Sequence, residues 1–415
     1  MKKSQTKQVV ASCFLANTLE IYDFVIFGFL SKSLHENYLS FLSKETALLV
    51  TYIFFAIGFL FRPIGSLIFG YIGDTLGRKK ALVTSVSLMG ICSLTMCLLP
   101  TYEAIGIASC YIIVLVRVIQ GISVGGEFTG AIVFTMEHTE KRYRGLSIGI
   151  LAAGGACGVM LASLASKILQ NETLPGYSWR LAFLFGFCLA IVGFFIRKRL
   201  EDTKEFSKIK RSKGIPLLEG FKTQKLESLS TMLVAAANGT SFFFGSVFLS
   251  SHLSSIRADQ DYKYVSLLVS FVMFFTLPFS GYISDQFNRK NYLIFTSVAM
   301  AVTGFFFVNL ISFASGDVAI SIFSILYTLA ASAMIGGINI YSAEIFEAKT
   351  RMSCMSFFYS IGMGCIGGTV PMVANYITGR YNHPEYILGG YISIICLSAA
   401  LSVHLVKLKK LTKSS

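Results

Sequence analysis

Twelve apolar runs, each about as long as a lipid bilayer is thick, divide this sequence. A helix needs about 20 apolar residues to cross the hydrocarbon core. The runs are continuous rather than alternating in polarity, which favours helices over a β-barrel, and 54% of the 415 residues are hydrophobic against 14% charged. We therefore expect an all-α membrane protein with twelve transmembrane helices. The runs lie near residues 9–30, 47–72, 81–99, 105–134, 146–168, 181–196, 229–249, 264–283, 292–314, 318–341, 352–378 and 386–406.

The basic residues lie mostly in alternate connections between these runs. Counting from an N-terminus inside the cell, 27 of the 36 Lys and Arg residues fall on the inner side and seven on the outer side, with Arg62 and Arg117 inside runs. An excess of Lys and Arg marks the cytoplasmic side of a membrane protein. We therefore expect both termini in the cytoplasm. Topology also accounts for the net charge of +14, so nucleic-acid binding is not needed to explain it.

Cysteine, histidine and loop composition argue against catalysis. The nine cysteines lie inside runs, and the five histidines lie at run ends or in loops, without the paired spacing of a metal site. No loop combines a nucleophile with a base, a nucleotide cradle or a metal-binding cluster. The sequence thus predicts neither an enzyme nor a cofactor or metal site.

A polar stretch at 197–225 divides the runs into six plus six, and motifs repeat across that division. We expect a six-helix bundle at 1–198, a cytoplasmic linker at 199–227 and a second bundle at 228–415. Two related halves with a site at their interface are typical of alternating-access carriers. The repeated residues are Asp74 and Arg78 with Asp285 and Arg289, each pair four apart, Glu137 and Arg144 with Glu344 and Arg351, each pair seven apart, and Asn17 with Asn238.

Several motifs together resemble those of one transporter family. The tight turn after the second run, with Gly70, Asp74, Gly77, Arg78 and Lys79, resembles the signature loop of the major facilitator superfamily. Other segments resemble its metabolite:proton symporter branch, and within that branch the proline/betaine transporters. These segments are NTLEIYDF at 17–24, RPIG at 62–65, RVIQGISVGGE at 117–127, WR at 179–180 and GGTVP at 367–371.

The resemblance implies the major facilitator fold, with two six-helix bundles, in a bacterial inner membrane. It implies a symporter that imports a small polar metabolite with protons and functions as a monomer. We expect the metabolite to be a zwitterion such as proline or glycine betaine. An organic-anion symporter for a dicarboxylate such as 2-oxoglutarate is the alternative, and a sensor that keeps this scaffold without transport is a more distant one.

Ionisable side chains inside apolar runs carry the expected mechanism. An ionised group at the centre of a span costs about 2.5–3.5 kcal/mol, so each one needs a reason to be there. Glu20, Asp23 and Glu127 are the candidates for the coupled proton, and Arg117 is the candidate ligand of an anionic substrate group. Two structural alternatives stay open: an ion pair between Arg117 and Glu127, and pairing of Glu20 or Asp23 with Arg62.

Polar and aromatic residues near these charges complete the predicted binding site. Asn17, Glu20 and Asp23 follow one another at three-residue steps on one helix, so we expect all three to face one cavity. Aromatic rings could hold a quaternary ammonium group. The predicted substrate-binding residues are Asn17, Tyr22, Arg117, Gln120, Asn238 and Tyr359.

The resemblance also implies a gate at the cytoplasmic face. In the family, charged residues of the repeated turns pair with helix ends and with charges on neighbouring spans. A pair that exists in only one state biases the equilibrium between states, so these pairs are expected to hold the inner gate shut in the outward-open state. The expected gating residues are Asp74, Arg78, Glu137, Arg144, Asp285, Arg289, Glu344 and Arg351.

Overall fold

The computed structural model describes residues 3–171, 173–203, 205–206, 214–249, 253, 263–313 and 316–406. Within these residues every regular element is a helix, as the sequence predicts. Ten helical segments are long and apolar enough to cross a membrane. Within the described residues they correspond to ten of the twelve predicted runs, all except the second and the seventh.

The N-terminal half supplies the first six spans and two short connecting helices. Its elements are α1 Lys3–Phe29, α2 Ser31–Tyr38, α3 Lys44–Leu60, α4 Arg62–Thr75, α5 Arg78–Leu98, α6 Tyr102–Ile105, α7 Ala108–Glu137, the 3₁₀ turn η1 Lys141–Tyr143, α8 Arg144–Leu169 and α9 Arg180–Arg199.

The second predicted run forms two helices rather than one. α3 ends at Leu60 and α4 begins at Arg62, with Phe61 between them. Pro63 lies in the first turn of α4, where its missing N–H is tolerated, whereas inside a continuous helix its ring would clash with the preceding turn. The break leaves Arg62 at the first position of α4.

The C-terminal half begins after the linker helix and supplies the last six spans. In its seventh span, α12 buries several hydroxyl side chains and Asn238. The elements are the linker helix α11 Pro216–Thr223, then α12 Lys225–Phe243, the π-helix η2 Phe244–Phe248, α14 Lys263–Gln286, α15 Arg289–Phe313, α16 Asp317–Glu344, α17 Arg351–Ser360, η3 Ile361–Ile366, η4 Gly367–Thr369, α18 Val370–Arg380 and α19 Pro384–Leu405.

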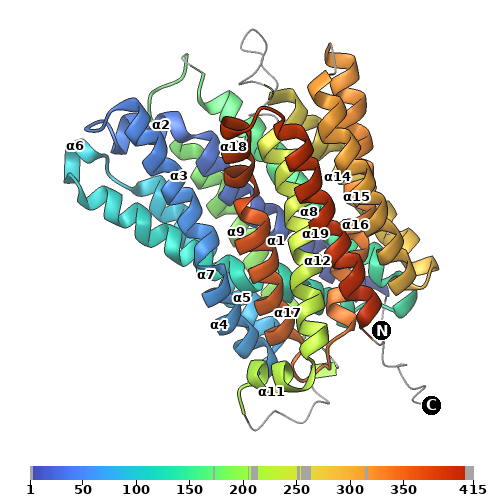
Figure 1. Ribbon diagram of the computed structural model, residues 1–415. Helices are drawn as coiled ribbons and strands as arrows, with labels where there is room; N and C mark the ends of the chain where they lie inside the picture. Colours follow the sequence, from blue (N-terminus) through green and yellow to red (C-terminus); the bar gives the residue numbers. More distant parts are fainter. Residues whose placement is uncertain are drawn as a thin grey trace.

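The two halves pack against each other along two helix pairs, α8 with α14 and α4 with α17 (Figure 1). The first pair is close because two glycines meet. A Cβ atom on Gly281 would overlap the carbonyl of Gly145, and a Cβ on Gly145 would overlap the carbonyl of Gly281. Small residues at such contacts let helix backbones approach in a membrane.

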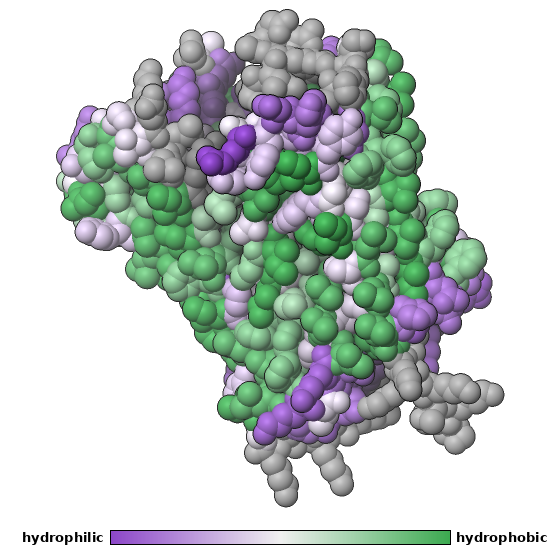
Figure 2. Space-filling view, in the orientation of Figure 1, coloured by the Kyte–Doolittle hydropathy of each residue, from purple (hydrophilic) through white to green (hydrophobic). Residues whose placement is uncertain are grey.

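The two ends of the molecule differ in the elements they carry. Helix α11, the start of α1 and the end of α19 lie at one end, which we call the α11 end, and α2 and α6 lie toward the other, the α2 end (Figure 1). Between them, green apolar side chains cover the middle of the visible face (Figure 2). On α14, Phe271, Phe275 and Phe279 are 55%, 59% and 64% exposed along one face, as in a helix that contacts lipid. The chain is an integral membrane protein.

Candidate functional site

A cavity of about 750 Å³ lies between the two halves. Its wall is mostly apolar, and the charged and amide side chains in it include Glu20 of α1, Arg62 of α4, and Asn17, Asn238 and Asn339. The cavity extends to Phe29 and Gln170, which lie at the α2 ends of α1 and α8. The α11 end, in contrast, is crossed by the ion pairs described below. The arrangement is therefore outward-facing if the α11 end is cytoplasmic.

Glu20 and Arg62 form a buried ion pair in the wall of this cavity. The Arg62 Nη2 atom lies 3.0 Å from Glu20 Oε1, and the Arg62 guanidinium carbon lies 5.6 Å from the centroid of the Phe59 ring. The other carboxylate oxygen, Oε2, is buried and accepts no hydrogen bond from the described residues. Pairing of Glu20 with Arg62, one of the two structural alternatives, is confirmed.

Three asparagines supply neutral hydrogen-bonding groups from both halves. Asn17 donates to the carbonyl of Leu151 at 2.9 Å. Asn238 donates to the Tyr359 hydroxyl at 2.6 Å, and that hydroxyl donates to Asn339 Oδ1 at 2.9 Å. Asn17 and Asn238 thus line the cavity from opposite halves, as their repeated positions predict. Sequence reasoning missed Asn339, which lies in an apolar run without a motif of its own.

Asp23 does not share the cavity with Glu20, so the expectation that α1 presents three polar residues to one cavity is wrong. Asp23 is fully buried inside the N-terminal half, where Ser93 donates to it at 2.7 Å and Gln120 donates to it at 2.5 Å. The reason is helical geometry. Each three-residue step rotates by about 60°, so two steps place Asn17 and Asp23 about 120° apart. Gln120 is correspondingly directed at Asp23 rather than at a substrate.

Arg117 also lies outside the cavity wall, so the structure contradicts its predicted position in the binding site. Its guanidinium carbon lies 3.4 Å from the centroid of Phe27 and 5.8 Å from that of Phe24. Among the described residues none forms a hydrogen bond with its three side-chain nitrogens, although the side chain is fully buried. Tyr22, another predicted substrate ligand, donates instead to the carbonyl of Ala182 at 2.8 Å.

Glu127 pairs with an arginine that was not a candidate. Arg197 Nη1, at the end of α9, lies 2.5 Å from Glu127 Oε1, and Ser85 donates to the same carboxylate. The alternative ion pair between Arg117 and Glu127 is wrong, because ten residues of α7 separate them by about 15 Å along the axis. Glu127 is buried away from the cavity wall and serves to join α7, α5 and α9.

The repeated aspartates at the α11 end make matching contacts across the two halves. Asp74 of α4 accepts hydrogen bonds from the backbone N–H groups of Met352 at 3.2 Å and Ser353 at 2.8 Å, at the start of α17. Asp285 of α14 accepts them from Gly145 and Leu146, at the start of α8. A carboxylate at a helix N-terminus satisfies unpaired N–H groups and interacts favourably with the helix dipole.

Arginines beside these aspartates extend each contact into an ion-pair network. All eight predicted gating residues take part. The pairs are Arg78 with Asp74 and, at 3.6 Å, with Glu137, Arg351 with Glu137 at 2.8 Å, Arg289 with Asp285 and Glu344 at 2.7 Å each, and Arg144 with Glu344 at 3.5 Å. Two of these pairs join the halves: Arg351 with Glu137, and Arg144 with Glu344.

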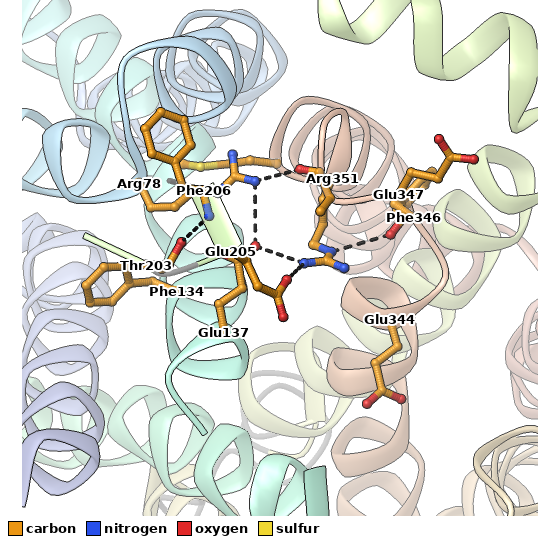
Figure 3. Close-up of polar contacts among 12 residues, drawn as sticks. Arg78, Phe134, Glu137, Thr203, Glu205, Phe206, Glu344, Phe346, Glu347 and Arg351 are labelled. Atoms are coloured by element: carbon orange, nitrogen blue, oxygen red, sulfur yellow. Dashed lines mark hydrogen bonds and ion pairs between the residues drawn. The ribbon is translucent and has the colours of Figure 1, made fainter. Parts of the chain in front are cut away.

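The linker adds an acid that sequence reasoning missed. Glu205 lies 2.7 Å from Arg351 and 3.8 Å from Arg144, so one carboxylate contacts an arginine from each half. Figure 3 shows Glu205 and Glu137 beside Arg351, with the Phe206 ring near Arg78. Glu205 is one of few acids in a stretch of ten basic residues, which is a weak signal in sequence.

A second linker contact lies on α11. Lys349 Nζ lies 2.5 Å from Glu219 Oε1, and this hydrogen bond raises the pKa of the Lys349 ammonium. The linker is therefore attached to the segment that precedes α17 as well as to the ion-pair network at the α11 end.

Comparison with known proteins gives concordant results. Residues 11–368 match the family described as "Major Facilitator Superfamily". The chain is 28% identical over 421 residues to the "Glycine betaine/proline/ectoine/pipecolic acid transporter OusA" of Dickeya dadantii, covering 95% of this chain and 82% of that protein. It is 28% identical over 386 residues to the "Citrate-proton symporter" of Klebsiella pneumoniae, covering 89% and 86%.

Among solved structures, the proton:xylose symporter XylE bound to 6-bromo-6-deoxy-D-glucose has a similar fold. The TM-score is 0.76 at 17% identity, with 97% of this chain and 95% of that chain covered. At this identity the likeness concerns the fold alone, and it agrees with twelve spans in two bundles.

Proposed function

Because the chain belongs to the major facilitator superfamily, we propose that it imports a small zwitterion, such as proline or glycine betaine, together with protons by alternating access. One observation carries the proposal: a cavity between the halves contains both a carboxylate and a guanidinium, and the opposite end is closed by bonds that join the halves. The similarity to a glycine betaine/proline transporter over 95% of the chain supports the same substrate class.

Transport of this kind fixes the orientation of the protein in the membrane and the parts that move. The protein lies in a bacterial inner membrane with its α11 end in the cytoplasm, which agrees with the basic linker, and both termini are then cytoplasmic. The bundles at 1–198 and 228–415 rock against each other as a monomer, with the linker at 199–227 connecting them. Opening toward the cytoplasm requires the Asp74 and Asp285 contacts to break.

Among the three carboxylates, the proposal assigns the coupled proton to Asp23. Glu20 and Glu127 each have an arginine partner within 3.0 Å, so each already pairs with a positive charge in this state. Asp23 receives hydrogen bonds only from neutral donors among the described residues, so it can exist in either form. Arg117, buried nearby without a hydrogen-bond partner, is the charge that Asp23 would attract once it releases its proton.

The proton assignment is tested by uptake into proteoliposomes. We expect Asp23→Asn to retain exchange of labelled substrate and to lose accumulation driven by an inward proton gradient. Asp317→Asn, an exposed acid at the α2 end, serves as the control. If Asp23→Asn still accumulated substrate against its gradient, another group would carry the proton, and if an uncoupler left wild-type accumulation intact, symport itself would be wrong.

An organic-anion symporter is the second candidate. The similarity to a citrate-proton symporter over 89% of the chain favours it, as does Lys167 in the cavity wall. Competition separates the two candidates. Glycine betaine should block uptake of labelled proline and 2-oxoglutarate should not, whereas the opposite pattern would favour the anion carrier.

A further inference from the structure

We propose that Glu20 and Arg62 form a two-charge recognition site that admits ammonium carboxylates and rejects dicarboxylates. This inference rests on the proposed transport function. Sequence reasoning treated the ion pair as a packing contact, whereas here it selects the substrate by charge.

Glu20 and Arg62 leave part of their hydrogen-bonding capacity unused in the cavity wall. Only one contact joins the two side chains, from Arg62 Nη2 to Glu20 Oε1 at 3.0 Å. Glu20 Oε2 is buried and has no hydrogen-bond partner among the described residues. The Arg62 side chain keeps 10% of its surface exposed beside the cavity. Each member therefore retains capacity for a second partner of opposite charge.

Aromatic rings line the cavity beside the pair. Phe24, Phe59 and Phe243 line the same cavity. The Phe59 ring centroid lies 4.5 Å from that of Phe24 and 5.4 Å from that of Phe243, with the rings edge to face. A quaternary ammonium group has no N–H to donate, so a carboxylate together with aromatic rings is the chemistry that recognises it. Glu20 and these rings together meet that requirement.

The opposite charges of Glu20 and Arg62 balance each other in a poorly solvated site. In the empty cavity each charge neutralises the other, which avoids an unpaired buried charge. An ammonium carboxylate can place its carboxylate on Arg62 and its cation beside the Glu20 carboxylate, which lines the cavity, and the site then stays neutral with two new pairs. A dicarboxylate can also pair with Arg62, but it brings a second negative charge toward Glu20. Selectivity then comes from repulsion as well as attraction.

Equilibrium binding to the purified full-length protein tests this proposal without any gradient. The probes are glycine betaine and succinate. We expect the wild type to bind glycine betaine at least tenfold more tightly than succinate. Glu20→Gln should weaken glycine betaine at least tenfold and strengthen succinate, while Arg62→Gln should weaken both. Glu36→Gln, an exposed acid of α2 at the cavity's open end, should change neither affinity.

The outcomes separate this proposal from the proposed function. An unchanged betaine-to-succinate ratio in Glu20→Gln, a wild type that prefers succinate, or a wild type that binds neither would overturn the recognition site. If Glu20→Gln does not fold, Glu20→Asp should keep the preference because it keeps the charge, and loss of the preference there would also overturn it. Failure of proton-driven accumulation with an intact Glu20-dependent preference would overturn symport only.

Discussion

Asp74 and Asp285, which lie in different halves, each hold the first turn of a helix that belongs to the opposite half. Asp74 binds the start of α17 through two backbone N–H groups, and Asp285 binds the start of α8 in the same way. The two contacts are related by the internal duplication. Both must break if the halves separate at the α11 end, so they are bonds of one conformational state.

Neutralising these aspartates should favour the state that is open at the α11 end. Hydrogen bonds to a charged group contribute about 1.5–3 kcal/mol, so Asp74→Asn or Asp285→Asn should shift the equilibrium roughly tenfold to a hundredfold. Spin labels at Tyr143 and Phe287, on opposite halves near the gate, would report a longer distance. Asp317→Asn is the matched control, and an unchanged distance distribution in both gate variants would contradict the gating role.

Glu205 should act as a third component of the gate although it belongs to the linker. Its carboxylate contacts Arg351 and Arg144 from the two halves, and partly exposed pairs of this kind contribute about 0.2–1 kcal/mol each. Glu205→Gln should therefore open the α11 end by a smaller factor than Asp74→Asn, measured with the same spin labels.

The control for the linker acid is Glu140→Gln, which changes an exposed acid at the same end of the molecule. A gate as tightly closed in Glu205→Gln as in Glu140→Gln would show that the linker contact follows closure without contributing to it.

Glu127 should matter for stability rather than for coupling. Glu127→Gln leaves Arg197 buried without its carboxylate, and breaking one partner of a buried pair costs about 3–5 kcal/mol. The midpoint of thermal unfolding in detergent should fall. The double variant Glu127→Gln with Arg197→Met should recover much of it, with proton-driven uptake retained. If a well-folded double variant lost proton-driven uptake, Glu127 would belong to the proton pathway.

Arg117 should show the reverse pattern. Its guanidinium is buried without a hydrogen-bond partner among the described residues, so Arg117→Met removes a desolvated charge and should leave thermal stability equal or higher. Proton-driven accumulation should nevertheless fall, because Asp23 loses the positive charge that is buried near it. A strongly destabilised Arg117→Met would instead indicate a packing role for the guanidinium against Phe27.

Local patterns accounted for the spans, and a family resemblance pointed to the ion-paired residues at the α11 end. Apolar length is a property of consecutive residues, so twelve runs could be counted from sequence, and Pro63 alone marks where the second run breaks. The ion pairs at the α11 end were expected from the resemblance to the major facilitator superfamily, whose signature turn Asp74 and Arg78 carry, and the same spacing recurs at Asp285 and Arg289. Their partners Glu137 and Glu344 repeat as well.

The arrangement of buried charges could not be predicted from local sequence patterns. Arg62 and Arg117 both stand as isolated arginines in apolar runs, and sequence favoured Arg117 for the substrate. Which of them faces the cavity depends on the rotation of α4 and α7 against their neighbours, and that rotation is set by packing between helices from distant parts of the chain. Glu127 likewise forms an ion pair with Arg197, which belongs to another span.

The order of apolar and charged residues along the chain was therefore enough to predict a twelve-span, two-half membrane protein with repeated charged turns, since insertion length and turn motifs are local. Tertiary structure alone decided that Glu20 with Arg62 forms the charged part of the cavity while Asp23 and Arg117 lie inside the N-terminal half. A helix of known sequence can present any of its faces to the centre, and only contacts among all the helices select one.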